Sequence, residues 1–367
     1  MEIVTHLRSL PSPKTLIIDS ALSRYSARSS SSLSSYSSSS SCSSSEIAPP
    51  DDSLGSEILS KMKDPRISEQ ESALISLRRA TRESSDRRIS LCTPTLLAAL
   101  RPLLGSRYKM IQNNAVAALV NLSLEPRNKV PVMRSGAVPA LVEVLRCGHD
   151  EARDNAAGAI FSLSLEDDNK AAIGVLGAVP PLLHLFARPS EGARARRDSG
   201  MAIYHLCTLG TNTKRVAKGA RAVVGVAKEG GELGMVAMMV VCRLAGCAEG
   251  RAALMDADAV SAIVELLRKS SSAEEEYCVG ALYGMSKGGL RFLGMARAAA
   301  AAEVVASVAE KESAGEAVRE MARRTVMVIR GEMEDGSDSV EFDSGVSWRK
   351  RLNEFISSDS DGVNNSF

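Results

Sequence analysis

The stretch DNAAGAIFSLSL, Asp154 to Leu165, decides the fold because its apolar pattern recurs along the chain. Read as a helix, it places four residues at i, i+3, i+4 and i+7, on one face: Ala156, Ala159, Ile160 and Leu163. Five further copies begin at Gln70, Ala115, Ser199, Ala237 and Cys278. The six starting points are separated by 45, 41, 43, 38 and 41 residues. A period of this length predicts stacked helical repeats, because one unit cannot bury its own apolar face.

Composition agrees with an all-α protein. Of the 367 residues 44% are hydrophobic but only 4% aromatic, and apolar residues such as Ala, Val, Leu and Met suit closely packed helices. The net charge of +1 favours no partner class and, with so few aromatic residues, argues against nucleic-acid binding. The seven cysteines form no CxxC pair, which is typical of a reducing compartment, so we expect a cytoplasmic or nuclear protein. No apolar window is long enough to span a membrane.

Each repeat of about 41 residues is predicted to contain a short, a middle and a long helix. A glycine precedes the middle helix, where left-handed backbone is expected: Gly136, Gly177 and Gly219. An asparagine begins the short helix, where it is expected to act as the N-cap: Asn128, Asn169 and Asn212. These markers place the boundaries between the helices.

Several sequence segments resemble those of a known protein family. They read ISLCTPTLLAALRPLLGSRY (89–108), NNAVAALVNLSL (113–124), NKAAIGVLGAVPPLLHL (169–185), EGRAALMDADAV (249–260) and ALYGMSKGGLRF (281–292). This text resembles the armadillo-repeat region of plant U-box ubiquitin ligases, in the subgroup with a Ser-rich arm. The resemblance implies an armadillo-repeat, right-handed superhelical solenoid of about six repeats over residues 56–330.

Both ends of the chain are predicted to be disordered. Residues 1–55 form a Ser-rich arm that has too few apolar residues to fold, with an organelle transit peptide as the alternative interpretation. Residues 331–367 form an acidic, mostly disordered tail. Nothing in the sequence resembles the Cys-Pro-Ile motif that begins a U-box, and the arm is too short and Ser-rich to fold as one. We therefore expect a protein-binding module of the ubiquitination pathway without its own U-box. The alternative is a component of a ubiquitin ligase, either truncated or acting in trans.

The resemblance also implies where a partner binds. In such a stack the third helices line a concave groove that holds a partner as an extended peptide. One predicted row of groove residues is Asn121, Ser162, His205 and Arg243. A second row is Asn114, Asn155, Asp198 and Tyr277, for which helix capping or solvation is the alternative. A nuclear-import receptor is disfavoured, because the tryptophan row of those receptors is missing and Trp348 lies outside the repeats.

A basic cluster follows the third repeat's middle helix. Its members are candidate contacts for an acidic or phosphorylated peptide: Arg194, Arg196, Arg197, Lys214 and Arg215. The alternative is a solvated loop and helix face. The carboxylates Glu274 to Glu276 are predicted to be a solvated helix start.

Catalytic motifs are missing from the sequence. The four histidines, His6, His149, His184 and His205, show no metal-ligand spacing, and neither a phosphate-binding loop nor a nucleophile elbow is present. We therefore expect no catalytic residue, no metal and no cofactor. Partners are expected to be proteins or peptides.

Overall fold

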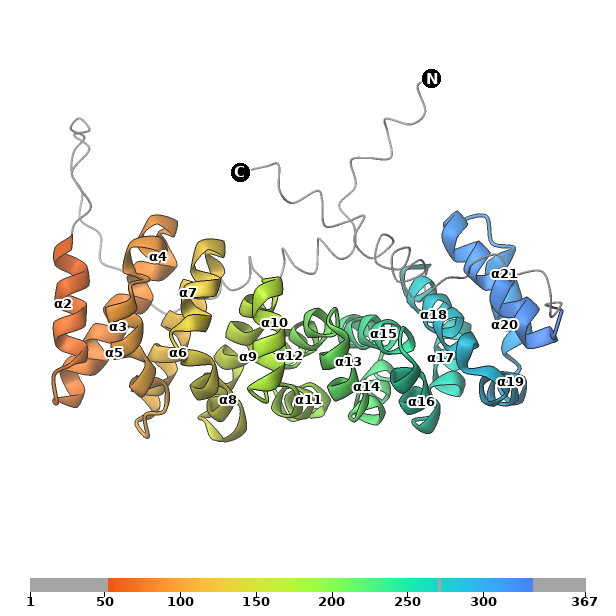
Figure 1. Ribbon diagram of the computed structural model, residues 1–367, viewed down its shortest axis with the longest axis horizontal. Coiled ribbons are helices and arrows are strands. Elements are labelled where there is room, and N and C mark those ends of the chain that lie inside the picture. The colour runs from red at the N-terminus through yellow and green to blue at the C-terminus, as the bar shows by residue number, and fades with distance from the viewer. Residues whose placement is uncertain (1–51, 270–271, 333–367) are drawn as a thin grey trace, which may run out of the picture. The chain divides into compact units, whose positions relative to one another are not determined.

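The computed structural model describes residues 52–269 and 272–332, and every regular element in these ranges is a helix (Figure 1). The predicted disordered arm and tail lie almost entirely outside the described residues. Helix α2 (Asp52–Met62) begins inside the segment assigned to the arm. Its Ile58 and Met62 are buried, so the folded region begins slightly before residue 56.

Helices α2 and α3 (Ile67–Glu83) precede six three-helix repeats. The first helices are α4 (Ser85–Leu91), α7 (Lys129–Arg134), α10 (Asp167–Val175), α13 (Gly210–Ala217), α16 (Ala248–Asp256) and α19 (Gly289–Ala298). Short 3₁₀ turns, η2 (Pro126–Asn128) and η3 (Ser286–Gly288), lead into α7 and α19. The second helices are α5 (Pro94–Leu104), α8 (Ala137–Cys147), α11 (Val179–Ala187), α14 (Ala220–Ala227), α17 (Ala259–Lys269) and α20 (Ala301–Ala309). The third helices are α6 (Lys109–Leu124), α9 (Asp150–Ser164), α12 (Ala193–Leu206), α15 (Gly231–Ala245), α18 (Ser272–Met285) and α21 (Glu316–Arg330).

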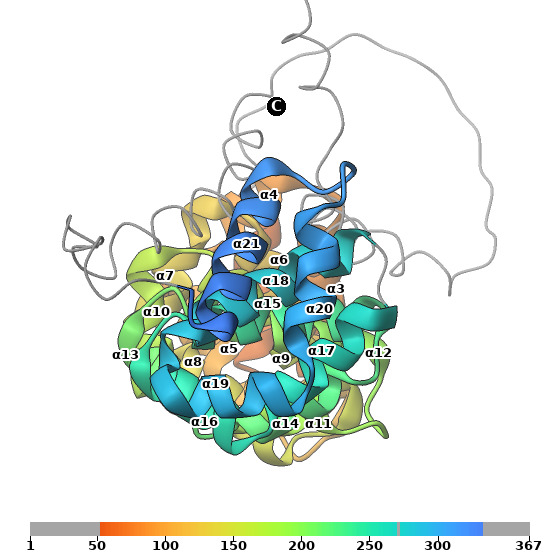
Figure 2. The same ribbon diagram turned by 90° about the vertical axis from the view of Figure 1, so that its right-hand side faces the viewer.

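The core consists of the recurring apolar face. In α9 the predicted residues Ala156, Ala159, Ile160 and Leu163 are all fully buried, and the corresponding residues of α6, α12, α15 and α18 are buried as well. Each third helix packs against the third helix of the next repeat, from α3 through α6, α9, α12, α15 and α18 to α21 (Figures 1 and 2). The all-α solenoid predicted from the period is therefore confirmed.

The glycines before the second helices follow the prediction in two repeats. Gly136 and Gly177 have φ of 74° and 85°, in the left-handed region. Gly219 does not, with φ of −106°. A Cβ there would lie 2.6 Å from Leu183 Cδ1, so this glycine is needed for space rather than for backbone freedom. In the last two repeats the left-handed position is held by Asp258 and Ala300, with φ of 55° and 51°.

The three asparagines predicted as N-caps have a different function, because their side chains donate hydrogen bonds to backbone carbonyls of the preceding repeat. Asn128 Nδ2 donates to Arg88 O at 2.7 Å and to Leu122 O at 3.0 Å. The corresponding bonds run from Asn169 to Lys129 O and Leu163 O, and from Asn212 to Lys170 O. The asparagines therefore join successive repeats instead of capping a helix within one.

Within the described ranges, no single helix is both long and apolar enough to cross a bilayer. Two bent helix pairs pass that length and composition test together: α10 with α11, and residues 274–298 with α20.

Candidate functional site

The two predicted rows lie across neighbouring third helices. Asn114, Asn155, Asp198 and Tyr277 lie near the N-terminal ends of α6, α9, α12 and α18, and Asn121, Ser162, His205 and Arg243 lie near the C-terminal ends of α6, α9, α12 and α15. We call the side of the stack that carries these eight residues the third-helix surface. The first three lie inside their helices rather than before them, so the capping alternative is wrong for Asn114, Asn155 and Asp198.

The N-terminal row is bonded to arginines. Three buried acceptors each pair with one guanidinium group: Asn114 Oδ1 with Arg78 Nη1 at 3.0 Å, Asn155 Oδ1 with Arg194 Nη2 at 3.2 Å, and Asp198 Oδ1 with Arg197 Nη2 at 3.5 Å. Burial raises the pKa of Asp198 to about 6, against the opposing effect of Arg197 and Arg194. Tyr277 is buried in α18, and its carbonyl accepts a hydrogen bond from the Cys242 thiol at 3.1 Å.

Two members of the C-terminal row bond the preceding third helix. Asn121 Nδ2 donates to Arg78 O at 3.1 Å, and Ser162 Oγ donates to Ser123 O at 2.7 Å. Both side chains are buried, so they contribute to the joint between repeats. These two side chains would therefore lie beneath a partner molecule bound on this surface.

The other two members of this row, His205 and Arg243, lie against aromatic rings. The His205 ring lies 5.7 Å from the Phe161 ring and 5.2 Å from the Tyr204 ring, measured between centroids. The Arg243 guanidinium lies 4.8 Å above the Tyr204 ring and donates to the Tyr204 hydroxyl at 3.1 Å. Burial, reinforced by nearby cations, lowers the pKa of His205 to about 3, so its imidazole is neutral at pH 7.

The predicted basic cluster is divided by the structure. Arg194, Arg196 and Arg197 lie in the first turns of α12, not in a loop. Arg196 is buried; its Nε donates to Phe186 O at 2.9 Å and its Nη2 to Glu229 at 2.7 Å. Arg197 is buried between Asp198 and Glu232, both at 3.5 Å. The charges of Arg196 and Arg197 are therefore already balanced within the chain.

The other two members lie in α13, a first helix, and not in a third helix. Lys214 is 61% exposed and pairs with Glu249 at 2.6 Å. Arg215 donates to Thr211 O at 3.1 Å. The structure therefore does not bring the five predicted basic residues together on one surface.

A second set of inter-repeat contacts was not predicted. The fourth residue of several third helices carries a polar side chain that bonds the loop between the second and third helices of the next repeat. The pairs are Gln112 with His149 N, Arg153 with Glu191, Arg196 with Glu229, and Glu275 with Lys311. We call this the clamp position. Glu275 is buried, so the prediction of a fully solvated Glu274–Glu276 helix start is wrong for this residue. The only sequence signal is that Gln112, Arg153, Arg196 and Glu275 share one register.

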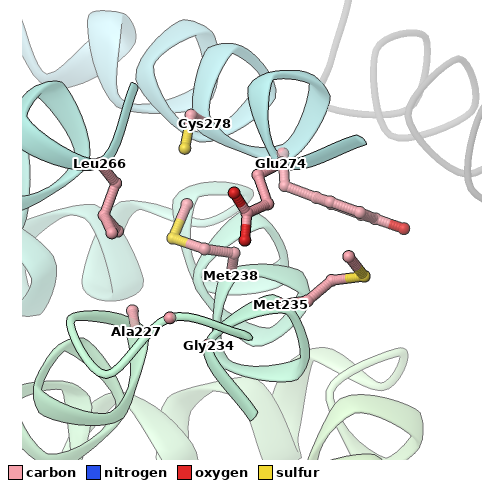
Figure 3. Close-up of a pocket in the computed structure, with 9 residues that line it drawn as sticks. Ala227, Gly234, Met235, Met238, Leu266, Glu274 and Cys278 are labelled. Atoms are coloured by element: carbon pink, nitrogen blue, oxygen red, sulfur yellow. The ribbon is translucent and has the colours of Figure 1, made fainter. Parts of the chain in front are cut away.

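The clamp is missing in the fourth repeat, where Gly234 occupies the position. An apolar cavity of about 20 Å³ lies beside this glycine, lined by Met235 and Met238 of α15 and by Tyr277 and Cys278 of α18 (Figure 3). A space of that size holds about one water molecule. The cavity is therefore a packing gap at the boundary between the fourth and fifth repeats, too small to admit a partner's side chain.

A metal site is not evident in residues 52–269 and 272–332, where no group of three His, Cys, Asp or Glu side chains converges. The described histidines are also separated. His149 precedes α9, where its backbone N–H donates to Gln112 Oε1 of α6 and its ring contacts Arg107 O. His184 lies in α11 and His205 in α12.

Stacked three-helix units with this third-helix surface define an armadillo-repeat solenoid protein. The armadillo/beta-catenin-like repeat family matches residues 125–165, from η2 to the end of α9. The chain is homologous to plant U-box domain-containing proteins over about four fifths of its length. Protein 38 of Arabidopsis thaliana is 45% identical over 302 residues, which cover 78% of this chain and 54% of the relative. Protein 41 of the same plant is 42% identical over 301 residues, which cover 81% and 53%.

The chain spans about half the length of these curated relatives, and the described residues contain no U-box. Solved structures agree on the fold. An engineered protein superposes with a TM-score of 0.67 at 19% identity, covering 76% of this chain and 68% of its own. A chain from a structure of the phosphorylation switch that controls the interaction between cadherin and beta-catenin gives 0.64 at 19% identity, covering 76% and 52%.

Proposed function

We propose that this chain binds a partner protein along the third-helix surface and acts in the ubiquitination pathway as a non-catalytic binding protein. The observation that supports the proposal most is the alignment of polar side chains across α6, α9, α12 and α15 at one level of the stack. An extended polypeptide laid across these helices would pass over one such position per repeat and could contact the half-buried His205 and Arg243 directly. The homology to U-box domain-containing proteins supports the pathway. The proposed place of action is the cytoplasm, the nucleus or both.

Site-specific photo-crosslinking tests the surface. A crosslinking amino acid replaces Met110 at the start of α6, which is 51% exposed, or Asp154 in α9. The matched controls replace Val175 in α10, which is 71% exposed, and Leu290 in α19. A protein captured in plant extract from the third-helix positions but not from the controls supports the proposal. Capture only from Val175 or Leu290 contradicts it.

The second candidate is a component of a ubiquitin ligase that promotes ubiquitin transfer to a bound substrate. It is favoured by the identity of 41–45% to U-box domain-containing proteins. Purified full chain is incubated with ubiquitin, activating enzyme and conjugating enzyme, with and without the captured partner. Ubiquitinated product would refute the non-catalytic proposal, and its absence with every conjugating enzyme tried would refute the ligase candidate.

A further inference from the structure

Glycine replaces the side chains that join neighbouring repeats at one junction of the stack. Three positions carry such side chains in earlier repeats: the clamp position, the asparagine that begins the first helix, and the C-terminal row of the third helix. The clamp position of the fourth repeat is Gly234. In the fifth repeat the other two positions are Gly250 and Gly284. All three glycines lie at the junction between the fourth and fifth repeats, where none of them has a side chain to donate or accept a hydrogen bond.

The same positions form polar contacts at the earlier junctions. Arg153 pairs with Glu191 at 3.2 Å, and Asn169 Nδ2 donates to Leu163 O, also at 3.2 Å. Ser162 Oγ donates to Ser123 O at 2.7 Å. A hydrogen bond of this kind shifts an equilibrium about five-fold, so three of them shift the balance between a closed and an opened junction roughly a hundred-fold.

A gap lies between the two third helices at the level of Gly234. The apolar cavity described above, of about 20 Å³, separates Met235 and Met238 of α15 from Tyr277 and Cys278 of α18 (Figure 3). Methionine side chains are unbranched and repack more readily than other apolar side chains. Small movements of α18 relative to α15 are therefore easily accommodated at this level.

The C-terminal ends of the same two helices are in close contact. A Cβ on Gly284 of α18 would lie 2.8 Å from Ala245 Cβ, and a Cβ on Gly250 of α16 would lie 2.0 Å from Leu244 O. Leu244 and Ala245 belong to the last turn of α15. Arg251 Nη1 also donates to Ala245 O, at 3.2 Å. The junction is therefore closely packed at the end of α15 and has a gap near its start.

Two further contacts cross this junction, and both are weak. Lys214 of α13 pairs with Glu249 of α16 at 2.6 Å, but these side chains are 61% and 52% exposed, and exposed ion pairs add little stability. The Cys242 thiol donates to Tyr277 O at 3.1 Å, and a thiol is a weak donor. Neither contact restores the polar joint that the glycines lack.

We propose that the junction between the fourth and fifth repeats is a hinge, about which the last two repeats bend relative to the first four while both parts stay folded. The last turn of α15 is the pivot, because Gly250 and Gly284 pack directly on it. The bend opens and closes the gap beside Gly234. As a result, the third-helix surface changes its curvature at one point of the stack. The inference concerns the chain alone and does not depend on the proposed function.

Distances between paired spin labels on the full chain test the hinge. The labels are attached through a non-canonical amino acid, because the chain has seven cysteines. The test pair is Val175 in α10 with Ala252 in α16, and the control pair is Arg134 in α7 with Lys214 in α13. All four positions are exposed, and both pairs span two junctions between the same positions of the first helices.

Only the test pair crosses the junction between the fourth and fifth repeats. Packed helices that move at an interface typically shift by about 1–2 Å, so the Val175–Ala252 distances should be more widely distributed than the Arg134–Lys214 distances by at least that amount. Amide hydrogen exchange in α15, α16 and α18 should stay slow, because bending does not unfold these helices.

Removing the polar joint from another junction should create the same behaviour there. Arg153→Ala/Asn169→Ala deletes two of these contacts between the second and third repeats and should broaden the Arg134–Lys214 distribution. The control Arg79→Ala/Glu83→Ala deletes an ion pair within α3 and should leave the distribution unchanged. Circular dichroism confirms that each variant is folded, and Arg153→Ala alone is the milder second variant.

Equally narrow distributions for the two label pairs in the unmodified chain would overturn the proposal. Exchange in α16 and α18 as fast as in an unfolded peptide would also overturn it, because local unfolding would then explain the broad distances. A folded Arg153→Ala/Asn169→Ala variant with an unchanged Arg134–Lys214 distribution would contradict the role assigned to the three glycines.

Discussion

Replacing Asn128 removes the best-defined link between two repeats. Its side-chain amide is buried in η2 and uses both N–H groups, one on Arg88 O at 2.7 Å and one on Leu122 O at 3.0 Å. Each acceptor is a backbone carbonyl of the preceding repeat. Asn128→Ala therefore deletes two hydrogen bonds and leaves two carbonyls without that donor.

The expected loss of stability follows from these contacts. A net contribution of about 1 kcal/mol per hydrogen bond, plus the desolvation cost of a carbonyl left unbonded, gives about 2–4 kcal/mol for Asn128→Ala. Asn128→Asp keeps the shape but replaces the donor with a carboxylate facing two carbonyl oxygens. It should therefore be more destabilising than the alanine variant by about 1 kcal/mol or more.

Urea unfolding of the full chain, combined with hydrogen exchange of peptides from α4, α6 and α7, measures both effects. Ser135→Ala is the matched control, because Ser135 Oγ bonds only Val132 O within its own repeat, and should cost less than about 1 kcal/mol. The reasoning is refuted if Asn128→Asp is as stable as Asn128→Ala, since the amide would then not be donating to carbonyls.

Three further substitutions test burial, backbone strain and charge. The folded-state pKa of Asp198, about 6, lies above the unfolded value of 3.8, so the wild type loses stability as the pH rises from about 4 to 7. Asp198→Asn should therefore raise the stability at pH 7 by up to about 3 kcal/mol and flatten its pH dependence. Denaturation at several pH values measures both effects. Ala300→Gly should stabilise the protein by about 1 kcal/mol, because Ala300 is exposed and has a φ of 51°, in the left-handed region. The control Ala298→Gly, at the end of α19, should not stabilise it. Thermal unfolding measures both variants. Arg196→Ala should cost about 2–4 kcal/mol, and Lys214→Ala less than about 1 kcal/mol, in the same urea assay; similar losses would contradict the difference in burial.

The core of the fold was predictable from the sequence because it depends on a local signal. The apolar spacing that begins at Ala115, Ser199 or Ala237 is visible within one helix, and its repetition predicts the stack. Every member of the pattern in α6, α12 and α15 is buried, as expected.

The contacts between repeats were not predictable in the same way, because each depends on two segments far apart in the chain. Asn128 precedes a helix and therefore suggests a cap, and only the position of Arg88 O shows that it donates instead. The clamp position holds Gln, Arg, Arg, Gly and Glu in successive repeats, so residue type gives no pattern. What these residues share is a register and a loop in the next repeat.

The sequence predicted which helices carry the candidate site residues, but not how those side chains are buried and bonded. The eight residues of the two rows do lie in third helices, but six of them are buried. Four of the six also bond a neighbouring repeat: Asn114, Asn121, Asn155 and Ser162. Arg196 and Arg197 suggested an exposed basic patch because charged runs usually face solvent. They are buried because Glu229 and Glu232 of the next repeat reach them, which a linear pattern does not show.

Hydrogen exchange on Leu163→Ala tests most directly whether the repeats form one continuous stack. Leu163 is fully buried in α9, which packs against both α6 and α12, and its truncation should cost about 2–5 kcal/mol. We expect protection to fall in α6, α9 and α12 together, and to fall least in α21, the last third helix of the stack. A loss confined to α9, with α6 and α12 unchanged, would contradict the stack and the surface built on it.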